Sequence, residues 1–316
     1  MNIQQLHYIV AVDIYRHFAT AAERCFVTQP TLSMMIQKLE NELGVKIFDR
    51  TKQPVQPTDV GVEILKQARK VLFEVESIAE LVKSHKGEVK GELKVGIIPT
   101  LSPYLLPMFL TKFLKKYPMV NIRLADLTTQ QIVEKLGSQE LDVGILATPL
   151  NIPSIRETPL FYEQFVVYTS AKESAINKKF LLTKDIDVNR LWLLEEGHCL
   201  RSQVINLCEL KKKELEVHNL DYEAGSIETL KKIVDISKGI TILPELAVND
   251  FSASQQKQLH FFKSPAPVRE ISLVTYRHFS KKKLIEVLMK EILNGIPDRM
   301  KHVNRKQITG IKVSMT

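Results

Sequence analysis

Three cysteines, Cys25, Cys199 and Cys208, are the residues of this 316-residue sequence whose chemistry is most informative. None of them stands in a close-spaced Cys/His cluster of the kind that holds zinc, so we expect neither a metal site nor a cofactor. Cys199 falls between a predicted strand, 191–194, and a predicted helix, 200–210. Backbone N–H groups at the N-terminus of a helix stabilise a thiolate. The sequence therefore predicts a reactive thiol at Cys199, whereas Cys25 is predicted to be a small buried residue.

A thiolate in such a position can reduce hydrogen peroxide and become a sulfenic acid, which condenses with a second thiol. His198 and Arg201 can add positive charge beside it, and Cys208 supplies a thiol nine residues further on. Nine helical steps separate the two α-carbons by ~13 Å, whereas a disulfide tolerates at most about 7 Å. The pair could therefore join only if the helix opened. By spacing alone, two such cysteines are more often unrelated core residues, so this alternative stays open.

The bulk composition places the chain among globular proteins of two or three domains. Hydrophobic residues make up 44% and charged residues 25% of the 316 positions. The opening residues lack the basic region, the apolar run and the cleavage site of a secretory signal. No run approaches the ~18 apolar residues that span a membrane. We therefore expect a cytoplasmic protein without a membrane partner.

The net charge of +8 is weak support for nucleic-acid binding because of where it lies. Residues 1–60 carry six basic and six acidic side chains, whereas residues 299–316 carry five basic ones and no acidic one. The excess is thus concentrated in a tail, for which we expect solvated disorder rather than a phosphate contact. An argument for DNA binding has to rest on pattern.

The pattern in the first 90 residues is that of a winged helix-turn-helix. Apolar periodicity predicts helices over 2–15, 18–26 and 29–43, with Val27 and Thr28 forming the turn. Thr28 can cap the third helix, Pro30 suits its first turn, and Gly44 can end it. Strands predicted over 45–50 and 55–57 form the wing. We assign 1–58 to this domain and 59–87 to a linker helix that also dimerises; a long helix packed on its own domain is the alternative.

The remainder of the chain alternates strands and helices, which is typical of an α/β fold. After a charged hinge, strands are predicted over 93–98, 120–124 and 143–147, with helices over 103–117 and 129–137 between them. We expect a two-lobed α/β domain over 91–298. The first lobe comprises about 91–160 and 269–298, the second about 161–268, and 299–316 form the basic tail.

The second helix of a helix-turn-helix lies in the major groove, where its early residues reach base edges. Gln, Ser and Thr side chains can read bases, whereas Lys and Arg mostly hold phosphates. Arg50, at the edge of the wing, is a candidate for a phosphate or minor-groove contact. The other candidate DNA-binding residues are Gln29, Pro30, Thr31, Ser33, Gln37 and Lys38. An ordinary polar face on a three-helix domain is the competing interpretation.

Several blocks of this region together resemble the N-terminus of the LysR-type transcriptional regulators. They are Phe18-Ala19-Thr20-Ala21-Ala22-Glu23, Thr28-Gln29-Pro30-Thr31-Leu32-Ser33, Leu43-Gly44-Val45, Phe48-Asp49-Arg50 and Thr58…Gly61. The α/β pattern that follows is similar to the two-lobed, periplasmic-binding-protein-like effector domain of that family, so the resemblance covers roughly residues 1–298. It implies promoter DNA and RNA polymerase as partners, and a homotetramer built as a dimer of dimers with paired linker helices.

Within that family, three blocks resemble the peroxide-sensing branch. They are Glu196-Gly197-His198-Cys199-Leu200-Arg201…Cys208, Pro99-Thr100…Pro103-Tyr104-Leu105-Leu106-Pro107 and Ser226…Glu228-Thr229-Leu230. The resemblance implies a regulator that senses hydrogen peroxide through a reversible Cys199–Cys208 disulfide and is not an enzyme. It also implies a peroxide pocket formed by Thr100, Thr129, His198 and Arg269, although the neighbouring Thr128 could replace Thr129.

Three other functions remain as alternatives. The first is a LysR-type regulator that responds to a small metabolite in the cleft between its lobes, with incidental cysteines. The second is a thiol peroxidase, which would use the same chemistry but would have no use for a DNA-binding module. The third is a solute-binding protein, which shares the two-lobed architecture but requires an export signal.

Overall fold

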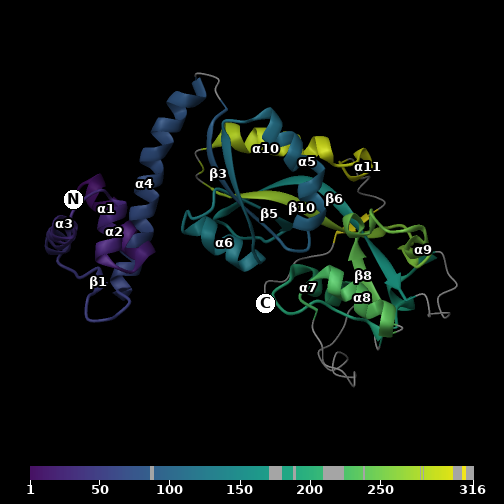
Figure 1. Cartoon of the computed structure of the whole chain (residues 1–316). Helices are drawn as coiled ribbons and strands as arrows, with labels where there is room; N and C mark the ends of the chain where they lie inside the picture. Colours follow the sequence, from purple (N-terminus) through teal and green to yellow (C-terminus); the bar gives the residue numbers. More distant parts are fainter. Residues whose placement is uncertain are drawn as a thin grey trace. The chain divides into compact units, whose positions relative to one another are not determined.

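The computed structural model has two compact units, Met1–Glu88 and Val89–Thr316, which we describe one at a time (Figure 1). It describes residues 1–85, 89–170, 180–187, 190–208, 224–237, 239–277, 279, 281–301 and 308–310. In this part of the chain, no helix is long and apolar enough to cross a lipid bilayer.

The first unit is a three-helix bundle with a two-stranded wing and a long helix. Its elements are α1 (Ile3–Tyr15), α2 (Phe18–Arg24), α3 (Gln29–Leu43), β1 (Phe48–Asp49), β2 (Gln56–Pro57) and α4 (Asp59–His85). Both ends of α3 are capped as the sequence predicts. The Thr28 side chain accepts the Thr31 N–H at the N-terminus, and Gly44 ends the helix with a left-handed φ of 70°. Leu32, Ile36 and Leu39 form the inward face of α3 and are fully buried.

Two elements of this unit are shorter than the sequence predicts. The helix predicted over 18–26 ends at Arg24, because Phe26 takes a left-handed φ of 56° that breaks the helical path. The strand predicted over 45–50 is confined to Phe48–Asp49, which pairs antiparallel with Gln56–Pro57. The buried residues of this segment, Ile47 and Phe48, are adjacent rather than alternating, so the apolar pattern shows neither the buried face nor how many residues pair.

The second unit is built on one mixed nine-stranded sheet in the order β4-β3-β5-β10-β6-β9-β7, with β8 paired to β6 and β11 to β10. The strands are β3 (Gly91–Ile97), β4 (Val120–Asp126), β5 (Val143–Thr148), β6 (Ile155–Thr169), β7 (Phe180–Leu181), β8 (Ile240–Pro244), β9 (Leu259–Phe262), β10 (Ala266–Tyr276) and β11 (Ile308–Gly310). The helices are α5 (Ser102–Lys116), α6 (Thr129–Gly137), α7 (Cys199–Leu207), α8 (Ile227–Ser237), α9 (Ala253–Gln256), α10 (Lys282–Gly295) and α11 (Asp298–Lys301).

Two long strands, β6 and β10, join the lobes of this unit. The first part of β6 pairs antiparallel with β10, and its last part pairs with β8 and β9. One hydrophobic core surrounds β3, β5, α5 and α10, and another surrounds β8, α7 and α8. The sequence marks these strands only by two short segments rich in apolar residues, 165–168 and 271–274. The longer strands matter because side chains of β6 and β10 lie at the junction of the two cores.

The region around α7 also differs in part from the prediction. Leu191 and Leu194 form single bridges to Ile240 and Ala224, so 191–194 is not a regular strand. Helix α7 runs from Cys199 to Leu207 and Cys208 is its C-cap, while 209 and 210 lie outside the described residues. Most of the basic tail lies outside them too, but Ile308–Gly310 pairs in parallel with Ala266–Val268 of β10, which differs from the expected disorder.

Candidate functional site

The thiol of Cys199 is buried where the two cores of the second unit meet. His198 precedes the first turn of α7 as its N-cap, and Gly197 before it has a left-handed φ of 91° that turns the chain into the helix. Leu200 and Val204 of α7 pack in the core around β8, whereas Cys199 packs in the core around β3 and β5. The first residue of α7 therefore reaches from one lobe into the other.

Three of the predicted pocket residues come together at this thiol. The Thr129 and Thr100 hydroxyls, the Leu200 N–H and the charge of the Arg269 guanidinium all lie close enough to the Cys199 sulfur to lower the pKa of its thiol. The buried Thr129 Oγ1 has no hydrogen-bond partner among the described residues. Thr100 and Thr129 are 2% and 5% exposed, and Arg269 is completely buried. Thr128 is instead used as the N-cap of α6, where its side chain accepts the Gln131 N–H. The geometry therefore places Thr129, rather than Thr128, at the thiol.

All three nitrogens of the Arg269 guanidinium donate hydrogen bonds. Its Nη1 donates to Thr100 Oγ1 at 3.2 Å, its Nη2 to the Thr100 carbonyl oxygen at 3.3 Å, and its Nε to Glu163 Oε2 at 2.8 Å. Glu163 is fully buried on β6 and is not among the residues predicted from the sequence. The available signal was an acidic residue two positions before the apolar run of 165–168, because a buried carboxylate needs a partner.

His198 and Arg201 each have a partner in the loop before α7. The His198 Nε2 lies 3.5 Å from Glu195 Oε1. The Arg201 Nη1 donates to the Leu194 carbonyl oxygen at 2.7 Å, so its guanidinium is used to hold the loop before α7. The basic group that acts on Cys199 is Arg269, which lies 70 positions away in the sequence and on another strand.

Burial raises the pKa of the Cys199 thiol, and the charge of Arg269 and the hydroxyls of Thr129 and Thr100 oppose that rise. In the folded protein, Cys199 is therefore mostly a protonated thiol at neutral pH, and the thiolate expected at the helix N-terminus is the minor form. Burial also raises the pKa of Cys208, to about 11. Both cysteines are free thiols.

Gln203 is a second residue of this region that local sequence patterns do not predict. Its side chain is fully buried on α7, one helical turn after Cys199, and neither its Nε2 nor its Oε1 has a hydrogen-bond partner among the described residues. Residues four apart on a helix lie on the same face. An unpartnered buried amide is costly, so it marks a position where a small polar molecule can be held.

A cavity of about 390 Å³ lies elsewhere in the second unit. Its lining does not include Cys199, Thr100 or Arg269; it comprises Tyr104, Glu228, Lys231, Lys232, Asp235, Ala247, Asp250, Phe251 and Gln255. The Lys231 Nζ lies 2.6 Å from Glu228 Oε1, and the Tyr104 hydroxyl donates to the same oxygen at 2.9 Å. Several of its charged groups thus pair with each other.

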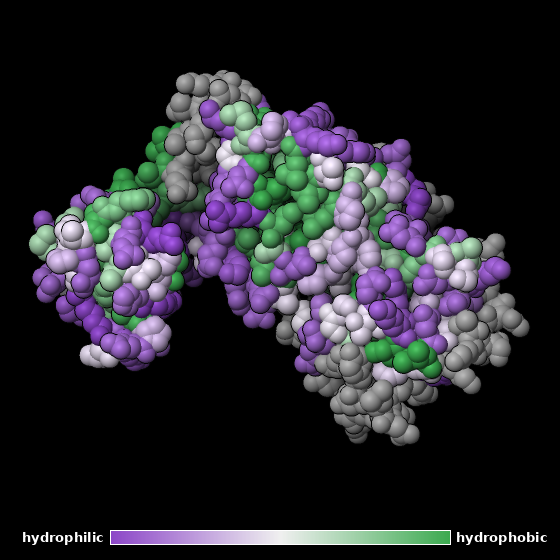
Figure 2. Space-filling view, in the orientation of Figure 1, coloured by the Kyte–Doolittle hydropathy of each residue, from purple (hydrophilic) through white to green (hydrophobic). Residues whose placement is uncertain are grey.

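The candidate DNA-reading residues lie on the free face of α3. Gln29, Pro30, Thr31, Gln37 and Lys38 are exposed, and Ser33 is half-buried. Hydrophilic side chains cover most of the visible face of the first unit (Figure 2). Met34, which is 60% exposed, was not among the predicted residues and shares this face.

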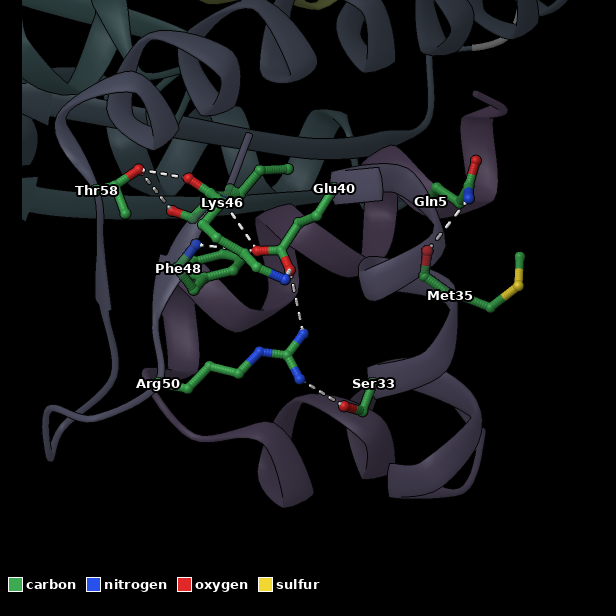
Figure 3. A network of polar contacts seen from close by, with 9 residues as sticks. Gln5, Ser33, Met35, Glu40, Lys46, Phe48, Arg50 and Thr58 are labelled. Carbon is green, nitrogen blue, oxygen red and sulfur yellow. Dashed lines mark hydrogen bonds and ion pairs between the residues drawn. The ribbon is translucent and has the colours of Figure 1, made fainter. Parts of the chain in front are cut away.

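Arg50 is the exception, because it already has partners within the domain (Figure 3). Its Nη1 donates to Ser33 Oγ at 3.0 Å, its Nη2 lies 3.4 Å from Glu40 Oε2, and its guanidinium stacks on the Phe18 ring. Glu40 is buried, and its Oε1 accepts the backbone N–H groups of Ile47 and Phe48. Arg50 thus ties the wing to α3 and, being partly exposed, keeps part of its guanidinium available to a phosphate.

Both units match families of known proteins. Residues 3–62 match the bacterial regulatory helix-turn-helix family of LysR proteins, and residues 86–296 match the LysR substrate binding domain. The chain belongs to the LysR family of transcriptional regulators. This agrees with the resemblance of the N-terminal motifs and with the two-lobed α/β fold of the second unit.

Among LysR-family proteins, the chain is similar to OxyR. It is 36% identical over 275 residues to the hydrogen peroxide-inducible genes activator of Haemophilus influenzae, covering 87% of this chain and 90% of that protein. It is 38% identical over 248 residues to the dual regulator OxyR of Escherichia coli, covering 78% and 80% of the two chains. A full-length OxyR variant from Pseudomonas aeruginosa superimposes with a TM-score of 0.79 at 34% identity, covering 93% of this chain and 98% of that one.

Proposed function

We propose that this LysR-family protein is a transcriptional activator that responds to hydrogen peroxide through Cys199. One observation carries the proposal: the Cys199 thiol lies close to the Thr100 and Thr129 hydroxyls and to the Arg269 guanidinium. Hydroxyl and guanidinium groups can donate hydrogen bonds to the oxygens of a peroxide and stabilise the negative charge on the departing hydroxide. The similarity to hydrogen peroxide-inducible activators supports the same conclusion.

The chemistry follows from the groups at the site. The Cys199 thiol loses its proton, and the thiolate sulfur attacks one peroxide oxygen; an S–O bond forms and the O–O bond breaks. The released hydroxide takes up the proton and leaves as water, so Cys199 is oxidised to a sulfenic acid. Arg269 and Thr100 stabilise the thiolate and the departing oxygen, which offsets the effect of burial on the thiol pKa.

Cys208 is the proposed second thiol. Its sulfur attacks the sulfenic acid of Cys199, an S–S bond forms and a second water leaves, so two thiols and one peroxide give a disulfide and two waters. The two cysteines lie at opposite ends of α7. Because such a helix separates the α-carbons by ~13 Å, the reaction requires α7 to unwind. That rearrangement would repack the lobe and provides the switch.

The output of the switch would be a change in how the assembled protein holds promoter DNA. Val71 and Ile78 of α4 lie two helical turns apart on one face and are 46% and 65% exposed, which suits pairing of two linker helices. We propose a homotetramer, a dimer of dimers, that acts in the cytoplasm on promoter DNA and RNA polymerase. The exposed residues of α3 would read bases, with Lys38 and Arg50 holding phosphates.

One experiment tests the proposal against its rivals. The purified protein is treated with one equivalent of hydrogen peroxide, its disulfides are mapped by mass spectrometry, and promoter DNA is footprinted before and after. We expect a Cys199–Cys208 disulfide and a changed footprint, and neither in Cys199→Ser. An unchanged footprint despite the disulfide, or an intact response in Cys199→Ser, contradicts the proposal. Sustained peroxide turnover with a thiol reductant would indicate a peroxidase instead.

A further inference from the structure

Glu163 and Arg269 face each other across the two strands that join the lobes. In the antiparallel register of β6 and β10, Arg269 is the direct partner of Glu163. Both side chains are completely buried, and Arg269 Nε lies 2.8 Å from Glu163 Oε2. The other carboxylate oxygen, Oε1, accepts the Leu246 N–H at 2.7 Å. Both oxygens of Glu163 are thus engaged, and the carboxylate is fixed at two points.

The hydrogen bonds also fix the direction of the Thr100 hydroxyl. Arg269 has only donors, so Thr100 Oγ1 accepts from Nη1 and its own proton has to point elsewhere. The Cys199 sulfur lies close to the same hydroxyl. A chain of contacts therefore runs from the Leu246 N–H through Glu163, Arg269 and Thr100 to Cys199.

We propose that Glu163 is a positioning residue for the thiol chemistry: it holds Arg269 against Thr100 and Cys199, and its carboxylate offsets part of the guanidinium charge at the sulfur. This inference rests on the proposed function, but it concerns a residue that does not touch the thiol. The two effects of Glu163 oppose each other. Its geometry makes Arg269 available to Cys199, whereas its charge weakens the electrostatic help that Arg269 gives to the thiolate.

The other ionisable groups near these contacts are paired elsewhere or neutral. Glu163 is therefore the group that offsets the charge of Arg269. Glu245 directly precedes Leu246, whose N–H Glu163 accepts, and its carboxylate pairs with Arg299 at 2.8 Å. The Tyr104 hydroxyl donates to Glu228, and burial raises the pKa of Tyr104, so it stays neutral. His198 lies against Glu195. Of these groups, Glu245 is the natural control, because it is a carboxylate near Glu163 that is paired with another arginine.

Two substitutions separate the effects. Glu163→Gln removes the charge and keeps one acceptor oxygen. We expect the pKa of Cys199 to fall by about one unit, which raises the thiolate fraction at pH 8 about tenfold. Because a thiolate of lower pKa is also a weaker nucleophile, alkylation of Cys199 by iodoacetamide should be about threefold faster. Glu163→Asp keeps the charge but shortens the side chain by one methylene, so it cannot reach both Leu246 and Arg269. Because Arg269 is then no longer held against the thiol, we expect slower alkylation, the opposite of Glu163→Gln, and an oxidation rate constant with peroxide about tenfold lower.

The experiment uses the full-length chain and follows Cys199 by mass spectrometry from pH 6.5 to 9.5. Glu245→Gln is measured in parallel, and we expect both of its rates to equal those of the wild type. Wild-type alkylation in Glu163→Gln overturns the charge effect, and wild-type peroxide kinetics in Glu163→Asp overturn the positioning. Should Glu163→Gln not fold, Glu163→Asp still decides the positioning.

The alkylation rate does not depend on peroxide, so this test can be told apart from failure of the proposed function. A wild-type protein whose Cys199 ignores peroxide would refute the proposed function. In that case the alkylation rate of Cys199 in Glu163→Gln would still test the charge effect of Glu163.

Discussion

Cys199 and Cys208 stand at the two ends of the same helix, Cys199 as the first residue of α7 and Cys208 as its C-cap. The backbone N–H of Cys208 bonds to the Val204 carbonyl oxygen at 3.0 Å, so the helical path is continuous up to that residue. Cys199 packs in one core and Cys208 against the other. A bond between the two sulfurs is therefore incompatible with an intact α7.

We predict that peroxide treatment removes the protection of α7 amides from hydrogen exchange. In the reduced protein, the amides of residues 203–207 are held by helical hydrogen bonds and exchange slowly. In the oxidised protein they should exchange at least tenfold faster, as measured by hydrogen–deuterium exchange and mass spectrometry. Cys208→Ser treated with peroxide is the control and should keep its protection. Full protection of α7 in the oxidised wild type would contradict the proposed unwinding.

The pKa of Cys208, raised to about 11 by burial, predicts a pH dependence of stability. The folded protein holds this thiol proton more tightly than the unfolded chain, whose cysteines ionise near pH ~8.5. The stabilising effect is thus fully present below pH ~8.5 and is lost as the pH rises towards 11. Urea unfolding of the reduced protein between pH 7.5 and 10.5 checks this. Cys208→Ser should flatten the decline, and an equally steep decline in that variant would point to other groups.

Glu40 is expected to be essential for the first unit alone. Its Oε1 accepts two backbone N–H groups, of Ile47 and Phe48, in a buried position. Glu40→Ala leaves both donors unsatisfied, which costs about 2–5 kcal/mol of unfolding free energy. DNA binding should be lost in a gel-shift assay, while peroxide still oxidises Cys199 in the second unit.

The matched control for this prediction is Glu42→Ala. Glu42 is exposed and pairs with the N-terminal ammonium group, so its removal should change stability by less than ~0.5 kcal/mol. Equal losses in the two variants would show that burial of Glu40 is not the reason.

The candidate DNA contacts make different predictions for different side chains. Lys38→Ala should weaken binding to all sequences and lower the slope of log affinity against log salt concentration by about one unit, because one phosphate contact is lost. Gln37→Ala should instead relax the preference for one base pair, at a cost of about 1–3 kcal/mol. Fluorescence anisotropy with specific and scrambled duplexes distinguishes them. Lys257→Ala, an exposed lysine of the second unit, should change neither.

The exposed apolar positions of α4 predict self-association. Val71→Glu combined with Ile78→Glu places two charges on that stripe and should shift the protein to smaller assemblies in analytical ultracentrifugation. Glu74→Gln, at an already exposed polar position, should leave the mass unchanged. An unaltered mass of the double variant would place the interface elsewhere.

Local signals in the sequence determined most of the helices and the arrangement of the first unit. Thr28, Pro30 and Gly44 mark the ends of α3 because caps act on adjacent backbone groups. The helix predicted over 129–137 coincides with α6. Cys199 at the N-terminus of α7 and the helical separation of the two cysteines also followed from nearby residues.

Tertiary structure decided what surrounds Cys199. Thr100, Thr129, Glu163 and Arg269 come from separate elements, and no local period links them. The pairing register of β6 and β10 places Glu163 opposite Arg269, and burial sets the direction in which the thiol pKa moves. These properties depend on contacts between distant segments and on exclusion of water, which a pattern of neighbouring residues does not encode.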